Sequence, residues 1–194
     1  KDKNIKIFCG KPLIYWSILV SKKSKYIDKT YVTSDDPKIL KYALKLKCEI
    51  VKRGKNLSNN TVMNDAAVVD VLKRHGKHFD LCVFLQPTSP LRNSFHIDEA
   101  ITLCKNKGAM SCASVTKVSQ NPYWMYSLDK NQEIQPLIKG KLPSRRQDLP
   151  AIYRLNGAIY ICNVDWLNRN KSLIGSKTLG YVMNNSDSFI AAWL

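Results

Sequence analysis

The chain has 194 residues, of which 44% are hydrophobic and 9% aromatic, so it is long and apolar enough to bury a core. No apolar run approaches the roughly 20 residues that a membrane-spanning helix needs, and we expect a single domain over residues 1–194 with no membrane partner. The net charge of +16 invites a nucleic-acid partner. Most of the 31 basic residues are lysines scattered along the chain, however, as on a solvated surface, so we expect no nucleic-acid partner.

The six cysteines form no C-x-x-C pair and have no spacing typical of a metal site. Most of them lie in apolar stretches, which indicates buried thiols in a reducing compartment. We therefore expect a cytoplasmic protein without a structural zinc site. The chain begins at Lys1 and enters a motif at once, so we also expect the protein to have further residues upstream.

Strand and helix patterns alternate over the first 118 residues. The predicted strands cover residues 30–33, 48–51, 81–85 and 109–118, and the predicted helices cover residues 12–22, 37–46, 64–75 and 94–104. The strand at 81–85 is a continuous apolar run, which is typical of a strand buried on both faces. This alternation predicts an α/β fold, in which a mostly parallel sheet carries helices on both faces.

The pattern changes after residue 118. Residues 120–126 are aromatic and strand-like, and residues 129–132 indicate a hairpin turn. We predict an excursion from the sheet over about residues 119–150, whose aromatic surface serves either a subunit contact or a small satellite core. A strand over 153–162, interrupted at Asn156 and Gly157, a helix over 164–168 and a strand over 179–183 complete the chain.

A polar loop follows the strand at 81–85. Gln86 is followed by Pro87 and Pro90, which end the strand and stiffen the loop. The loop thereby presents Gln86, Thr88, Ser89 and Arg92 at the carboxyl end of a strand, where open α/β sheets bind ligands. A plain strand-to-helix connection remains the alternative.

Several arginines gather in loops that the same edge of the sheet would hold. Arg53 follows a predicted strand, and Arg146 and Arg154 lie in polar segments that could fold over this edge. Guanidinium groups suit forked recognition of phosphate or carboxylate, so we expect a cleft for an anionic ligand. The sequence has no Ser-His-Asp set and no carboxylate pair with acid–base spacing, so catalysis there would depend on positioning and charge neutralisation.

Several motifs carry a resemblance that spans nearly the whole chain in order. They are L-Q-P-T-S-P-L-R at 85–92, R-R-Q-D-L-P-A-I-Y-R-L-N-G-A-I-Y-I-C at 145–162, N-P-Y-W-M at 121–125, K-N-I-K-I-F-C-G-K-P-L-I at 3–14 and T-Y-V-T-S-D-D at 30–36. Together they resemble the CMP-sialic acid synthetases (acylneuraminate cytidylyltransferases), a family that includes the CMP-legionaminic and CMP-pseudaminic acid synthetases. The related Kdo synthetases carry acidic residues in the loop where this chain has Pro-Thr-Ser.

The resemblance implies a Rossmann-like nucleotidyltransferase fold with a small dimerisation insert, and a homodimer. It implies a reaction of CTP with an acidic nine-carbon sugar, a nonulosonic acid, that yields the CMP-sugar and pyrophosphate with Mg²⁺. The implied catalytic residues are Lys3 and Arg154, and the implied nucleotide-binding residues are Lys3, Asn4 and Arg53. The implied sugar-binding residues are Gln86, Pro87, Thr88, Ser89, Arg92, Arg146, Gln147, Arg154 and Asn156.

Two departures from the family pattern leave an alternative open. The glycine-rich loop that cradles the triphosphate in this family does not precede Lys1, and the acidic residues that would supply Mg²⁺ ligands do not follow Asp187 and Ser188. We can therefore name no metal ligand in this chain. A non-catalytic homologue that binds a nucleotide or an anionic sugar and lacks the metal site is the alternative to the enzyme.

Overall fold

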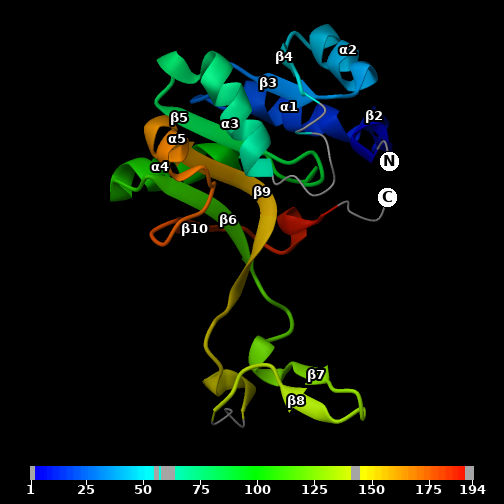
Figure 1. Cartoon of the computed structure of the whole chain (residues 1–194), viewed down its shortest axis with the longest axis vertical. Helices are drawn as coiled ribbons and strands as arrows, with labels where there is room; N and C mark the ends of the chain where they lie inside the picture. The colour runs from blue at the N-terminus through cyan, green and yellow to red at the C-terminus, as the bar shows by residue number, and fades with distance from the viewer. Residues whose placement is uncertain (1–2, 55–56, 58–63, 141–144, 191–194) are drawn as a thin grey trace.

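The computed structural model describes residues 3–54, 57, 64–140 and 145–190. Its strands are β1 (Ile7–Phe8), β2 (Lys11–Pro12), β3 (Tyr31–Ser34), β4 (Glu49–Lys52), β5 (Leu81–Leu85), β6 (Ser111–Lys117), β7 (Tyr126–Leu128), β8 (Ile134–Pro136), β9 (Tyr153–Asn163) and β10 (Leu179–Val182). Its α-helices are α1 (Leu13–Lys23), α2 (Pro37–Lys45), α3 (Asn64–His75), α4 (Ser94–Lys107) and α5 (Val164–Asn170). Apart from β7 and β8, these strands and helices form the body of the molecule (Figure 1).

The main sheet has four strands in the order β10-β6-β9-β5. Strand β10 is parallel to β6, but β9 is antiparallel to both of its neighbours, β6 and β5. The predicted α/β fold is confirmed, and the sheet is mixed, since β5, β6 and β10 run in one direction and β9 alone runs in the other. The chain leaves the sheet at the carboxyl end of β6 and returns to it, as β9, at that same end. A strand that returns in this way pairs antiparallel with the strand before it.

Helices cover both faces of this sheet, as predicted. On one face, Ile97 and Ile101 of α4 pack against Ile159 and Ile161 of β9. On the other face, α3 and α5 pack in a cluster that contains Cys162, the next residue along β9. Successive side chains of a strand point to opposite faces, so the alternation along β9 places these two cores on opposite sides of the sheet. All five residues of β5 are half-buried, which is less than the full burial that its apolar sequence predicted.

A second sheet consists of β3 and β4, which pair in parallel, and α1 and α2 pack against it. Their shared core includes Ile14 and Ile18 from α1 and Ala43 from α2. Helix α2 begins as its sequence predicts, because Pro37 occupies its first turn and the Asp36 side chain accepts a hydrogen bond from the Lys38 amide (2.7 Å). No helix within the described part of the chain is long and apolar enough to cross a bilayer.

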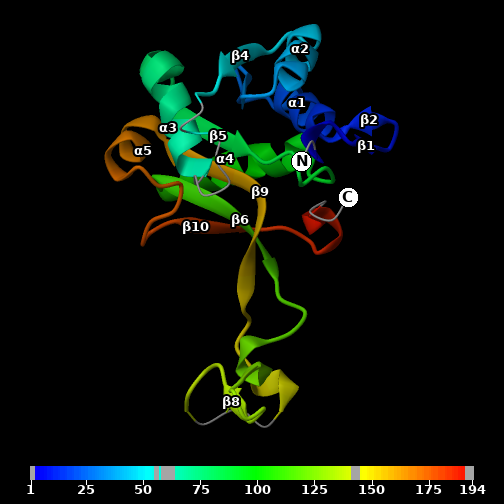
Figure 2. The same ribbon diagram turned by 45° about the vertical axis from the view of Figure 1, so that its right-hand side comes forward.

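Residues 118–152, which we call the arm, leave the sheet between β6 and β9. The arm projects from the body in both views and ends in the antiparallel β7–β8 hairpin (Figures 1 and 2). The β1–β2 hairpin, the loop after β5 and the 3-10 turn Ser186–Ser188 lie on the same side of the body (Figure 2). The predicted excursion of about residues 119–150 therefore corresponds closely to the arm.

Candidate functional site

The loop after β5, residues 86–92, is a tight and largely buried turn, which we call the β5 turn. The Ser89 amide donates to the carbonyl oxygen of Gln86 (3.3 Å), with Pro87 and Thr88 between them. Proline at the second position of such a turn fixes its φ angle in advance. Ser89 is buried and its Oγ has no hydrogen-bond partner among the described residues. The turn thus holds Gln86 at the carboxyl end of β5 with little freedom.

Strand β9 has a bulge beside the β5 turn. Ala113 of β6 pairs with Tyr160, and Val115 pairs with Leu155, so residues 156–159 of β9 stand opposite the single residue Ser114. We call residues 156–159 the β9 bulge. Bulges of this kind redirect a strand and are common near active sites. The interruption predicted at Asn156 and Gly157 lies inside it.

Gly157 is the point at which the β9 bulge meets the β5 turn. Its φ is +72°, in the left-handed region that favours glycine, and a Cβ at this position would lie 2.7 Å from Oε1 of Gln86. The Gln86 side chain therefore lies directly against the β9 backbone. Two sequence motifs that are about 70 residues apart are thus in contact.

Arg92 is only 2% exposed. Its Nη1 donates to the carbonyl oxygens of Gln86 (2.9 Å) and Ala158 (2.8 Å), and its Nη2 donates to Oγ of Ser17. Burial lowers the pKa of this guanidinium to about 9. The side chain is thus enclosed by α1, the β5 turn and the β9 bulge, and in this conformation it presents no atoms to a ligand at the surface.

Asn156 is fully buried and anchors the β9 bulge to two other segments. Its Oδ1 accepts from Oγ of Ser114 (2.5 Å) and from the Ala158 amide (3.2 Å), and its Nδ2 donates to Oγ of Ser188 (2.9 Å). Asn156 therefore supports the bulge from beneath and does not face solvent. Ser114 and Ser17 carried no signal in the sequence, since an isolated serine in a strand or helix has no characteristic pattern.

The residues predicted for the nucleotide lie at the amino end of the chain and after β4. Lys3 is exposed and Asn4 half-buried in the 3-10 turn Lys3–Ile5. Arg53 donates from Nη2 to the Thr33 carbonyl oxygen (2.9 Å), and its Nε is buried without a partner in the described regions. Arg53 therefore ties the residue after β4 to β3, while its Nε–H has no acceptor among the described residues.

The remaining predicted residues lie on or beside the arm. Arg154 is exposed and stands opposite Thr116 at the arm's root. Gln147 is exposed on the arm itself, in the 3-10 turn Arg146–Asp148, and the side chain of Arg146 lies outside the described parts. Because the arm points away from the β5 turn (Figures 1 and 2), one chain does not bring Gln147 and Gln86 together.

His96 links the start of α4 to the segment after β10. Its Nδ1 accepts from the Asn93 amide (3.3 Å), and its Nε2 lies 3.8 Å from Oδ2 of Asp187. Burial lowers the pKa of His96, whereas the carboxylates of Asp187 and Glu99 raise it by a smaller amount. The imidazole is therefore held in its neutral form near pH 7, where it completes the capping box of α4.

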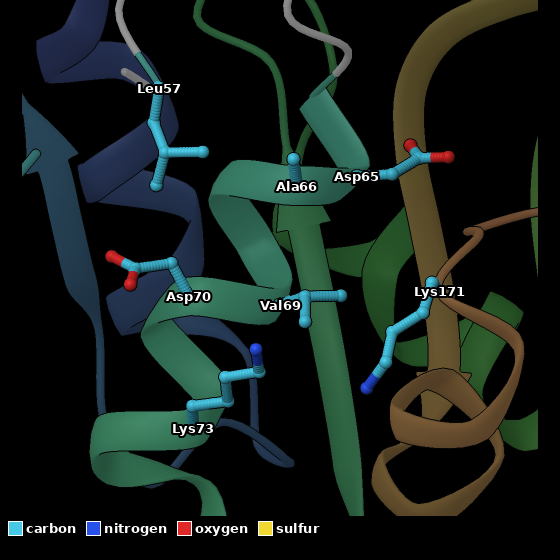
Figure 3. Close-up of a pocket in the computed structure, with 7 residues that line it drawn as sticks. All are labelled: Leu57, Asp65, Ala66, Val69, Asp70, Lys73 and Lys171. Carbon is cyan, nitrogen blue, oxygen red and sulfur yellow. The ribbon is translucent and has the colours of Figure 1, made fainter. Parts of the chain in front are cut away.

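A cavity of about 490 Å³ lies away from this surface, between α3 and the residue after α5. Lys73 and Lys171 point into it from the two sides of Val69 (Figure 3). Asp65 and Asp70 also line it, so its charges are mixed. None of the residues predicted for the nucleotide or the sugar lines this cavity.

A metal site needs several His, Cys, Asp or Glu side chains that lie close together. Nowhere in residues 3–54, 57, 64–140 and 145–190 do three His, Cys, Asp or Glu side chains come together so that they could hold a metal ion. The donor set that Mg²⁺ needs, several carboxylate oxygens, is therefore not met by this part of the chain, and no step below is assigned to a metal.

Comparison with known proteins agrees with the geometry. The cytidylyltransferase family model matches residues 1–176. The chain is 30% identical over 184 residues to an N-acylneuraminate cytidylyltransferase of Streptococcus agalactiae serotype III. The matched region covers 94% of this chain and 44% of that protein. It is 30% identical over 188 residues to a CMP-N,N'-diacetyllegionaminic acid synthase of Legionella pneumophila, which covers 94% of this chain and 80% of that protein.

Among solved structures, a CMP:2-keto-3-deoxy-manno-octonic acid synthetase complexed with CTP superposes with a TM-score of 0.68. It covers 94% of this chain and 83% of that chain at 14% identity, and this likeness concerns the fold alone. The chain spans less than half the length of the streptococcal relative. Both the sequence matches and the α/β architecture agree with the motifs at the β5 turn and the β9 bulge. The chain belongs to the cytidylyltransferase family.

Proposed function

We propose that this chain transfers CMP from CTP to a nonulosonic acid, an acidic nine-carbon sugar of the N-acetylneuraminate or legionaminate type. The observation that carries the proposal is the contact between Gln86 and Gly157, because it joins the two most specific motifs of the sequence into one surface. The names of the relatives support both CTP and this class of sugar.

The reaction is a displacement at the α-phosphorus of CTP. A hydroxyl oxygen of the sugar forms a bond to this phosphorus, the bond to the pyrophosphate oxygen breaks, and the hydroxyl proton passes to water. Negative charge increases on the departing pyrophosphate, so cationic groups near it lower the barrier. We assign this role to Lys3 and Arg154, whose exposed positions leave them available to a ligand.

We assign the nucleotide to the segment around Lys3, Asn4 and Arg53. Arg53 supports the assignment because its buried Nε has a free hydrogen among the described residues, while its Nη2 is held by the Thr33 carbonyl. A guanidinium fixed at one nitrogen and open at another is pre-oriented to bind an anionic or carbonyl oxygen.

We assign the sugar to Gln86, Pro87, Thr88 and Arg154, with Ser89 closing the turn. Gln86 offers both a donor and an acceptor to sugar hydroxyls, and Arg154 suits the substrate carboxylate. Arg92 and Asn156 belong to the support of this surface, since both are buried and both hydrogen-bond to other parts of the protein.

We further propose that the protein is a homodimer formed through the arm. Leu128 of β7 and Ile134 of β8 are cross-strand partners that are 69% and 63% exposed. Trp124, Met125 and Leu137 are exposed on the same arm. An apolar surface of this extent on a projecting element is typical of a subunit contact. In such a dimer Arg146 and Gln147, which the resemblance implies as sugar-binding residues, would lie near the partner subunit.

Two further features remain proposals from the family resemblance. One is a Mg²⁺ requirement, which treatment with EDTA followed by re-addition of MgCl₂ would test. The other is a cytoplasmic location, which the six free cysteines support because disulfides are rare in that compartment.

The decisive experiment measures pyrophosphate release by the full-length protein. CTP, ATP, GTP and UTP would each be combined with N-acetylneuraminate, N,N'-diacetyllegionaminate and Kdo. We expect release with CTP and a nonulosonic acid, and little with the other nucleotides or with Kdo. No release with CTP and any nonulosonic acid, in a protein that still binds CTP, would instead support the non-catalytic alternative.

A further inference from the structure

Arg92 is a buried cation that has no anionic partner in the described part of the chain. No carboxylate of the described residues pairs with it, and its hydrogen bonds go to two carbonyl oxygens and one hydroxyl. Moving a guanidinium out of water is costly, and an apolar side chain of similar volume is often at least as stable in such a place. Stability alone therefore does not account for an arginine at this position.

The acceptors of Arg92 come from three separate parts of the chain. Gln86 ends β5, Ala158 lies in the β9 bulge, and Ser17 lies in α1. A planar guanidinium has several donors in a fixed fork, and this geometry suits three acceptors that come from separate segments. Arg92 therefore sets the distance between the β5 turn and the β9 bulge.

Ser17 adds a second connection to the same carbonyl. Its Oγ accepts from Nη2 of Arg92 and donates to the carbonyl oxygen of Gln86 (3.4 Å). That oxygen thus receives hydrogen bonds from Arg92, from Ser17 and from the Ser89 amide. The backbone of Gln86 is held from three sides, while its side chain rests on Gly157.

We propose that Arg92 and Ser17 are positioning residues that fix Gln86 against the β9 bulge, so that its amide is oriented toward the acidic sugar. The proposal rests on the proposed function, since it deepens the role of the sugar side of the same site. It assigns Arg92 a role beneath the sugar site in place of direct contact with the sugar, and it adds Ser17, a residue of α1 that is distant in sequence.

The chain offers a matched control for Ser17. Ser21 lies one turn further along α1 and is similarly buried, at 3% exposed against 7% for Ser17. Its Oγ donates to the Ile18 carbonyl (2.8 Å) and lies 2.9 Å from Oγ1 of Thr30, away from the β5 turn. Ser21→Ala removes the same atom from the same helix without touching the positioning contacts.

The first part of the test is kinetic. For Arg92→Lys, which keeps the charge but not the fork, we expect the KM for the nonulosonic acid to rise about tenfold while the KM for CTP changes by less than about twofold. Ser17→Ala should shift the sugar KM in the same direction by a smaller factor, and Ser21→Ala should leave both KM values as in the wild type. A wild-type sugar KM in both Arg92→Lys and Ser17→Ala, or equal changes for sugar and CTP, would overturn the proposal.

The second part of the test does not depend on catalysis. Hydrogen exchange of the Ser89 amide, which donates to Gln86, should be faster in Arg92→Lys and Ser17→Ala than in Ser21→Ala and the wild type. Unchanged exchange in both variants would contradict the proposal. If the wild type released no pyrophosphate with any nonulosonic acid, the proposed function would fail, yet the exchange measurement would still decide whether Arg92 and Ser17 position Gln86. If Arg92→Lys did not fold, both the kinetic and the exchange measurements would be made on Ser17→Ala.

Discussion

Gly157 and Gln86 lie so close that the glycine has no room for a side chain. A Cβ at Gly157 would lie 2.7 Å from Oε1 of Gln86, and the φ of +72° already disfavours any other residue. The contact joins the end of β5 to the bulge of β9. The position of the Gln86 amide therefore depends on a strand that is distant in sequence.

Gly157→Ala should weaken use of the sugar. The new methyl group must displace the Gln86 side chain, so we expect a higher KM for the nonulosonic acid and a loss of about 1 kcal/mol in the free energy of unfolding. Steady-state kinetics and urea unfolding would measure the two effects.

Gly108 provides the control for Gly157→Ala. It ends α4 with a φ of +58°, but an added Cβ would meet nothing within 4 Å. Gly108→Ala should therefore cost similar stability from backbone strain alone and leave the sugar KM unchanged. Equal kinetic effects of the two substitutions would argue against the contact with Gln86.

Asn156→Ala should strongly destabilise the protein. It removes the partner of the buried Ala158 amide and one of the hydrogen bonds of Ser114 and of Ser188. Unsatisfied buried groups of this kind cost about 1–3 kcal/mol each, so we expect a loss of at least about 2 kcal/mol in the free energy of unfolding. Asn106→Ala, at an exposed position of α4, is the control and should change stability by less than about 0.5 kcal/mol. Similar urea midpoints for the two variants would count against the network.

Stability should decline in mild acid through His96. Burial holds the pKa of His96 below its usual 6.5 in the folded protein, so unfolding is accompanied by proton uptake. The neutral imidazole therefore makes its full contribution to the free energy of unfolding above about pH 6.5. That contribution is lost as the pH falls through the lower pKa of the folded state. His96→Gln keeps a side chain that can complete the capping box but does not titrate. Between pH 7.5 and pH 5.5 we expect the wild-type Tm to fall further than that of His96→Gln; parallel declines would show that His96 is not responsible.

The arm should control the oligomeric state. Leu128→Glu places a charge in the exposed apolar surface of β7, and burying that charge in a subunit contact would be unfavourable. We expect this variant to have the mass of a monomer by light scattering, while the wild type and Ser127→Glu, a substitution of the preceding residue of β7, have the mass of a dimer. A monomeric wild type would refute the proposed dimer.

Local chemistry made much of the fold predictable. The Asp36–Pro37 pair begins α2 and Asn93 caps α4, and helix α3 has the bounds that its apolar spacing predicts. These features depend on residues within one turn of each other. The antiparallel direction of β9 and the half-burial of β5 depend on long-range pairing, and no local pattern reports it.

The candidate site shows the same limit. The motifs identified Gln86 and Gly157 as parts of one family pattern, and the structure brings them into contact. Arg92 has the sequence context of an exposed loop cation, and only acceptors from α1 and β9 explain its burial. Ser17 could not be predicted at all, because its partners are about 70 residues away.

The most direct measurement compares the two KM values of Gln86→Ala with those of the wild type. The central claim is that Gln86, seated on the β9 bulge, holds the acidic sugar beside CTP. The account predicts a KM for the nonulosonic acid that rises about tenfold or more while the KM for CTP stays within about twofold of the wild type. Equal losses for the two substrates, or an unchanged sugar KM, would contradict it.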